Sequence, residues 1–166
     1  MTREMLFLAL LGSLQCNAAF AQLPHILGSW KLNGPASTYP GPLPQSQVRT
    51  YSSLEDGFLL GMVVTIDAQG NADFLQVAAR PDGRDYPEYD SFLLAQLQMS
   101  DKPTAATYSE QAVDDHTVAW VDKMAGAAYI TGTRQVSADG QSMVIEFELV
   151  NPQAEAQKFR LVYNRQ

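Results

Sequence analysis

The chain has few of the residues that carry nucleophilic and metal chemistry. Its 166 residues include one cysteine, two histidines and two tryptophans. A single cysteine cannot form a disulfide within the chain, so packing must hold the fold. The histidines, His25 and His116, lie in different segments without metal-ligand spacing, so we predict no metal site. No nucleophile-elbow, Walker or dinucleotide-binding motif is present, and we assign no cofactor and no catalytic residue.

Positive charge and long apolar runs are also scarce. Lys and Arg total 11 against 18 Asp and Glu, which gives a formal net charge of −7. Such a chain has no electrostatic reason to bind nucleic acid or an anionic membrane. Its longest apolar run, residues 5–14, is too short to cross a bilayer as a helix. We therefore expect neither a nucleic-acid partner nor a membrane span in the mature chain.

The first residues have the pattern of an export signal. Arg3 precedes the apolar run, and the small-x-small sequence Ala19-Phe20-Ala21 suits cleavage after Ala21. We predict a cleavable signal peptide at 1–21, one domain at 22–166 and an exported location, either periplasmic or secreted. Acylation of Cys16 is the alternative, although Gln15 fits a lipobox poorly. The sequence leaves the oligomeric state open.

The rest of the chain has the alternating pattern of short β-strands. Residues 142–150 place Met143, Ile145 and Phe147 on one face and Glu146 and Glu148 on the other. Similar segments cover 46–52, 57–66, 72–79, 116–122, 127–136 and 157–165. Asp139-Gly140 is the dipeptide that a tight hairpin prefers. For 90–102 the pattern fits a helix or a strand, and we favour a strand. We interpret the acidic residues at 82, 85, 88 and 90 as a charged hairpin turn.

This pattern predicts an all-β fold, an antiparallel up-and-down β-barrel of about eight to ten strands. Closing the meander removes the two exposed sheet edges, and a barrel of this size can enclose a small ligand.

The chain resembles exported bacterial lipocalin-like proteins, which are calycin-type barrels of unassigned function. The resemblance rests on the start Gly28-Ser29-Trp30-Lys31-Leu32-Asn33, then on segments 49–51, 82–87, 131–134 and 136–140, and on the ending at 162–166. It implies a lipocalin/fatty-acid-binding-protein-like barrel with Trp30 on the first strand, plugging one end. In that pattern a basic residue near the last strand packs across the indole, and Arg160 and Arg165 are the candidates. Segment 88–112 departs from the pattern.

The resemblance suggests that the barrel binds a small, mostly apolar molecule without catalysis. Aromatic and methionine side chains from several strands are the candidate ligand-binding residues, although the same residues would also fill a solid core. They are Tyr51, Phe58, Met62, Phe74, Trp120, Tyr129, Met143 and Phe147.

Two other functions stay open. A barrel-interior enzyme, of the isomerase or cyclase type, would need an inward carboxylate, Tyr or His beside a cavity. The polar candidates are Tyr108, Glu110, His116, Tyr129 and Arg134. A packed barrel acting as an interaction module would instead use an apolar surface in segment 88–112, around Phe92, Leu93 and Leu94.

Overall fold

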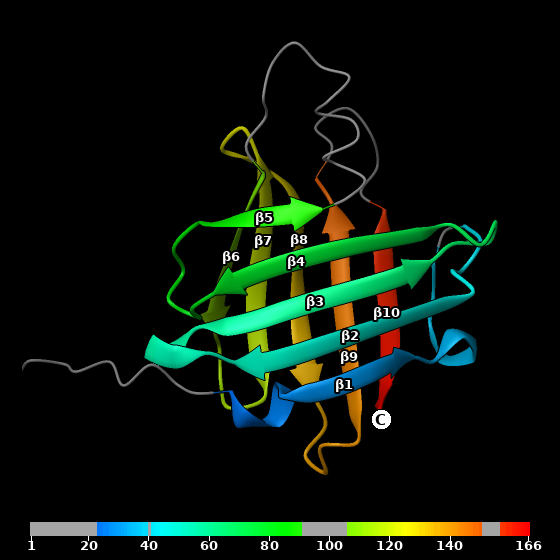
Figure 1. The fold of residues 1–166 in the computed structure, drawn as a ribbon, viewed down its shortest axis with the longest axis horizontal. Coiled ribbons are helices and arrows are strands. Elements are labelled where there is room, and N and C mark those ends of the chain that lie inside the picture. Colours follow the sequence, from blue (N-terminus) through cyan, green and yellow to red (C-terminus); the bar gives the residue numbers. More distant parts are fainter. Residues whose placement is uncertain (1–22, 40, 91–105, 151–156) are drawn as a thin grey trace, which may run out of the picture.

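Ten antiparallel strands form one closed barrel in the computed structural model, which describes residues 23–39, 41–90, 106–150 and 157–166 (Figure 1). The strands are β1 (Gly28–Leu32), β2 (Ser46–Ser53), β3 (Leu59–Ile66), β4 (Ala72–Ala79), β5 (Tyr86–Asp90), β6 (Ala106–Ala112), β7 (Thr117–Met124), β8 (Ala127–Val136), β9 (Ser142–Leu149) and β10 (Lys158–Arg165). Short 3-10 helices are η1 (Pro24–Ile26), η2 (Gly34–Ala36) and η3 (Glu55–Gly57). The predicted all-β, up-and-down barrel is confirmed.

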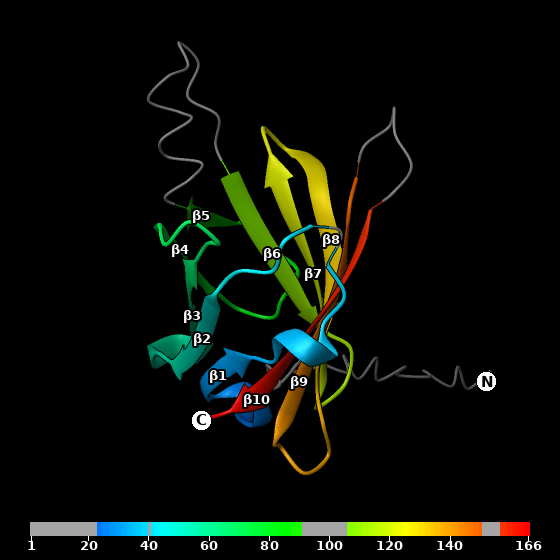
Figure 2. The same cartoon turned by 90° about the vertical axis from the view of Figure 1, so that its right-hand side faces the viewer.

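Each strand pairs with its neighbours in the chain, and β1 closes the barrel by pairing with both β2 and β10. Trp30 of β1 lies opposite Arg49 of β2 and Arg165 of β10. Strands β2–β5 cross in front of β6–β10, so the barrel is flattened into two layers (Figures 1 and 2). The join between β5 and β6 is short, with only Tyr86↔Tyr108 and Pro87↔Thr107 in register.

The hairpin residues act as their chemistry predicts. Gly140 follows Asp139 in the β8–β9 turn and has a φ of 68°, a conformation that glycine adopts without steric cost. The Asp139 carboxylate accepts a hydrogen bond from the Gln141 backbone N–H at 3.0 Å. This turn fixes the register in which Val136 pairs with Met143.

Segment 86–90 differs from the prediction of a charged turn. It is strand β5, in which Glu88 pairs with Val77 and lies buried on the inner face. The acidic residues suggested a turn, because in so short a segment they mask the alternation of inward and outward side chains that marks a strand. Most of the ambiguous 90–102 segment, and Phe92, Leu93 and Leu94 with it, lies outside the described residues.

One end of the barrel is filled by a tightly packed core. Trp30, Met143 and Tyr163 have no exposed surface, and Ile145 is 2% exposed. Leu23, which precedes η1, and Ile26, its last residue, pack into the same cluster. This filled end leaves the space for a ligand toward the middle and the other end of the barrel.

Candidate functional site

A cavity of about 150 Å³ lies inside the barrel, between the two layers. Its walls combine aliphatic, aromatic and charged side chains that alternation directs inward from β2–β9. The lining residues are Arg49, Tyr51, Gly61, Val63, Leu75, Val77, Glu88, Tyr108, Trp120, Asp122, Ile130, Arg134, Ile145 and Phe147. The interior is therefore partly hollow, and its lining combines apolar side chains from both layers with several charged groups.

Three of the candidate ligand-binding residues line this cavity. They are Tyr51, Trp120 and Phe147, and the rings of Trp120 and Phe147 lie 6.0 Å apart. Met143 is instead part of the filled core. Phe58 packs edge-on against Tyr86 at 5.6 Å, toward the edge of the barrel. Tyr129 is half-buried and does not line the cavity.

Met62 and Phe74 point away from the interior, which corrects the prediction for both. Met62 is 41% exposed and Phe74 is 47% exposed. The alternation in β3 separates two faces correctly, but the less apolar face is the inner one. Gly61 is on that inner face because the ring of Tyr51 occupies the space beside it: a Cβ at Gly61 would lie 3.2 Å from Tyr51 Cε1.

A buried ion pair, Arg134 with Glu110, lies at the cavity, and Arg134 is one of the lining residues. Arg134 Nη2 donates to Glu110 Oε2 at 2.9 Å, and the Tyr108 hydroxyl donates to the same oxygen at 2.7 Å. The guanidinium also lies over the Tyr51 ring at 4.7 Å. Burial works against the charge of Arg134, but Tyr51, Tyr108 and Glu110 outweigh it and raise the pKa of Arg134. Arg134 thus stays charged, and the contact brings together three polar residues that the sequence analysis named separately: Tyr108, Glu110 and Arg134.

Tyr108 keeps its proton in this arrangement. Burial, together with the neighbouring Glu110 carboxylate, raises the pKa of Tyr108 well above its ordinary value of 10. The phenol therefore serves as a hydrogen-bond donor at neutral pH.

Arg49 is the second inward cation, and its position differs from that of Arg134. Its Nε donates to the Tyr163 hydroxyl at 2.9 Å, and Tyr163 in turn donates to Gln47 Oε1. None of the ion pairs among the described residues includes Arg49. Burial alone would lower the pKa of Arg49, but Tyr163 and Tyr51 hold it above its ordinary value. A charged guanidinium held by two tyrosines therefore lines the cavity.

Two carboxylates complete the polar part of the lining. Glu88 is 8% exposed and Asp122 is 6% exposed, and both line the cavity with Tyr108. Sequence reasoning missed Arg49 and Asp122 as interior residues. Strand alternation could have identified them. Arg49 is two residues before Tyr51, and Asp122 is two residues after Trp120, so each pair lies on the same face of its strand.

Trp30 closes the filled end, and Arg165 makes the contact that the family resemblance implies. The Arg165 guanidinium lies 4.2 Å from the centre of the Trp30 indole. It also donates to the carbonyl oxygens of Leu27 at 2.7 Å and His25 at 2.6 Å, which fixes η1 over the barrel end. Arg160 lies elsewhere, exposed and paired with Glu146 at 3.4 Å.

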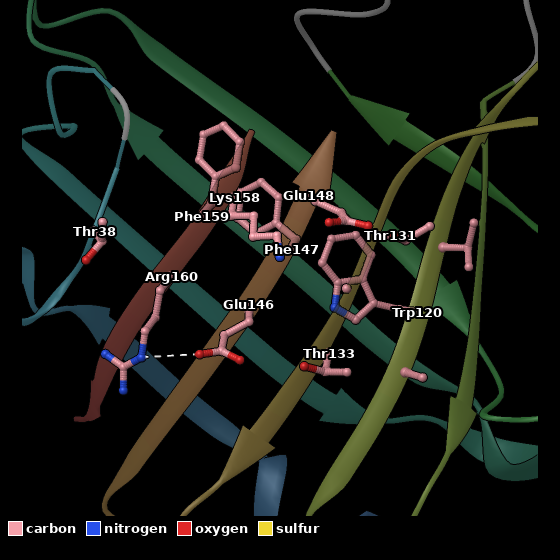
Figure 3. A pocket seen from close by; sticks show the side chains of 13 residues that line it. Thr38, Trp120, Thr131, Thr133, Glu146, Phe147, Glu148, Lys158, Phe159 and Arg160 are labelled. Carbon is pink, nitrogen blue, oxygen red and sulfur yellow. Dashed lines mark ion pairs between the residues drawn. The ribbon is translucent and has the colours of Figure 1, made fainter. Parts of the chain in front are cut away.

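A larger and more open depression of about 740 Å³ lies over β7–β10 (Figure 3). Its strands run in the opposite left-to-right order from Figure 1, because Figure 3 views them from outside the barrel. Charged side chains, among them the Glu146–Arg160 pair, border it. Trp120 and Phe147 border both this depression and the interior cavity. The two hollows therefore share part of their lining on β7 and β9.

The two histidines lie close together, away from the cavity lining. The rings of His25 and His116 stack with their centres 4.1 Å apart. No cluster of three or more His, Cys, Asp or Glu side chains there is arranged to hold a metal ion. In those same ranges, no helix has the length and apolarity needed to span a membrane.

Comparison with known proteins relates this chain to others through its fold. No protein-family model and no curated protein matches it. Among solved structures, the barrel is similar to wild-type fluorescent protein UnaG, with 13% identity, a TM-score of 0.55, and coverage of 87% of this chain and 99% of that one. It is also similar to Rv2717c from M. tuberculosis, with 14% identity, a TM-score of 0.54, and coverage of 87% and 94%. The chain therefore shares the closed antiparallel barrel fold of these two proteins.

Proposed function

We propose that this protein is an exported, non-catalytic barrel that binds one small, mostly apolar molecule carrying a hydrogen-bond-accepting or anionic group. One observation carries the proposal: the interior cavity combines apolar side chains with the buried, charged Arg49 guanidinium, which two tyrosines hold in place. The apolar side chains would hold the body of the ligand, and Arg49 would orient its polar end.

The size of the cavity limits the ligand. A volume of about 150 Å³ is that of a cavity which holds benzene in another protein. It is well below the roughly 300–1,000 Å³ of sites for drug-sized ligands. A single aromatic ring with one short substituent fits this space, whereas a long acyl chain would require the wall to move.

The polarity of the lining selects among small aromatic molecules. A carboxylate or carbonyl oxygen facing Arg49 would gain a charge-assisted hydrogen bond, worth about 1.5–3 kcal/mol. The same group facing Glu88 or Asp122 would be repelled. Benzoate-like ligands should therefore bind in one orientation, with the ring against Trp120 and Phe147.

Native mass spectrometry of the protein, purified gently from its own compartment, is the first test. A reproducible extra mass that is lost on denaturation supports a carried ligand. N-terminal sequencing of the same sample tests the export proposal, which expects Gln22 as the first residue. A purified chain that still contains residues 1–21 would contradict the export proposal.

A panel of probes then tests the role of Arg49. The affinity for benzoate, measured by quenching of Trp120 fluorescence, should fall by about 10- to 100-fold in Arg49→Met, since one charge-assisted hydrogen bond is lost. Lys31→Met is the matched control, because Lys31 is an exposed cation on β1, and its affinity should not change. Equal affinity for benzoate, toluene and benzylamine would contradict the assignment of Arg49.

The inward carboxylates favour a second candidate function, acid–base catalysis inside the barrel. Asp122 lies beside the cavity together with the protonated phenol of Tyr108, and its register partner in β6 is Tyr108 itself. A carboxylate and a phenol are a suitable base and acid for proton transfer. Deuterium uptake from heavy water into phenylpyruvate, measured by NMR, tests it. Uptake that the protein accelerates and Asp122→Asn abolishes would favour an isomerase over a carrier.

A further inference from the structure

The outer face of β2–β5 has no charged side chain. Alternation sends the neighbours of the inward residues to this face, and none of these outward positions is Asp, Glu, Lys or Arg. They are Ser46, Val48, Thr50, Ser52, Leu60, Met62, Val64, Ile66, Ala72, Phe74, Gln76, Ala78, Pro87 and Tyr89. Protein surfaces ordinarily carry about a quarter to a third charged residues, so this face is unusual.

Large apolar side chains are exposed at the centre of this face. Met62 is 41% exposed, Val64 40%, Phe74 47% and Tyr89 57%. They adjoin one another across the sheet, because Val64 pairs with Phe74, and Gln76 pairs with both Met62 and Tyr89. The exposed groups therefore form one continuous patch, which we call the β2–β5 patch.

The opposite layer of the barrel has an ordinary surface. The outer faces of β7–β10 carry Lys123, Glu146, Glu148, Lys158 and Arg160. The two layers share the same interior, so burial of the core does not explain why only one of them lacks charge outside. A partner that covers the β2–β5 patch does explain it.

The size of the patch suits a protein interface. Three strands of eight residues and one of five, spaced by about 4.8 Å and rising about 3.3 Å per residue, give a flat area of roughly 460 Å². Side-chain relief and the polar rim increase the accessible area toward the ~800 Å² per partner of a standard interface. Lys31 lies at this rim, beside Val48 in the register of β1 with β2.

Charge identifies the partner. The chain has a net charge of −7, so two copies repel each other wherever their carboxylates meet. The β2–β5 patch is a broad face where two copies can meet without bringing like charges together. It also lacks the Lys and Arg residues with which a protein engages anionic lipid headgroups.

We propose that two copies of this chain form a two-fold dimer through the outer faces of β2–β5. The same surface on each copy then packs against its equivalent, as in most two-fold dimers, with the sheets face to face about 10 Å apart. None of the patch residues Met62, Val64, Phe74 and Tyr89 lines the interior cavity, so the dimer proposal does not rest on the proposed ligand.

Sedimentation equilibrium tests the dimer on protein purified from cells that express the full chain. Between about 1 and 200 µM the wild type should sediment with twice the mass of one chain. Met62→Lys or Phe74→Glu places a charge at the centre of the two-fold interface, and each should raise the dimer dissociation constant at least 100-fold. Thr133→Glu is the matched control, because Thr133 is exposed on the outer face of β8, and it should leave the constant unchanged.

Circular dichroism and thermal unfolding confirm that each variant folds, since both substituted side chains are exposed. A wild type that is monomeric at 200 µM overturns the proposal. So does a dimer that tolerates Met62→Lys and Phe74→Glu. A monomer that floats with phosphatidylcholine vesicles, and loses this binding in Phe74→Glu, would assign the patch to lipid instead.

Discussion

The buried Arg134–Glu110 pair should be one of the most sensitive points of the fold. Glu110 is 2% exposed and Arg134 is 5% exposed, and they meet at 2.9 Å. Glu110→Gln preserves shape and an oxygen acceptor but leaves the guanidinium without a counter-charge. Removing one partner of a buried pair costs about 3–5 kcal/mol, against a total stability of about 5–15 kcal/mol for a domain.

Urea unfolding measures this loss. With a slope of about 2 kcal/mol per molar urea, the unfolding midpoint of Glu110→Gln should fall by about 1.5–2.5 M. Glu146→Gln is the control, because its partner Arg160 is 3.4 Å away and both side chains are about half exposed. Exposed pairs contribute about 0–1 kcal/mol, so this midpoint should shift by less than about 0.5 M.

A double variant separates the charge from the packing. Glu110→Leu with Arg134→Met removes both charges, and replacing a buried pair by apolar side chains is often neutral or stabilising. The double variant should therefore be more stable than Glu110→Gln. If Glu110→Gln shifts the midpoint no more than Glu146→Gln does, the charge of Arg134 is compensated by something other than Glu110, and the reasoning fails.

Three further predictions concern packing, pH and the closed end. Gly132→Ala should destabilise the fold by about 1–3 kcal/mol in urea and shift the Trp120 emission, because its Cβ would lie 2.6 Å from the indole; unchanged emission would contradict this. The pKa of Tyr108 is raised by burial and Glu110, so its contribution to stability is complete below pH 10 and is lost as the pH rises further. Tyr108→Phe should flatten the fall in urea midpoint above pH 10, and an unchanged slope would refute it. Arg165→Met should lower Tm by about 5–10 °C, whereas Arg160→Met, the exposed control, should change it little; equal effects would argue against the Trp30 contact.

Local chemistry determined most of the barrel. Alternation in residues 142–150 and 157–165 predicted β9 and β10 to within a residue or two, because each of these two strands has one buried apolar face and one polar face. Asp139-Gly140 predicted its hairpin. β5 was missed, because its five residues include a proline and two acidic side chains, which locally resemble a turn.

The candidate site could be predicted only in part. The sequence identified Tyr51, Trp120 and Phe147, since large aromatic residues in strands favour the interior. It did not identify Arg49 or Asp122, whose charge argues for solvent until a partner is known. The partners that make burial tolerable are distant in sequence: Tyr163 is 114 residues from Arg49, and Glu110 is 24 residues from Arg134.

By itself, then, the sequence determined that the chain forms short antiparallel strands with two distinct faces, because alternation and turn residues act over a few neighbours. Only the tertiary structure decided which face lies inside. In β3 it is the face of Gly61 and Val63, since Tyr51 of β2 needs the space that glycine leaves. That choice places Met62 and Phe74 outside, on a face without charge, and Arg49 inside. Closure of the barrel brings distant strands together, and no local pattern encodes their pairing.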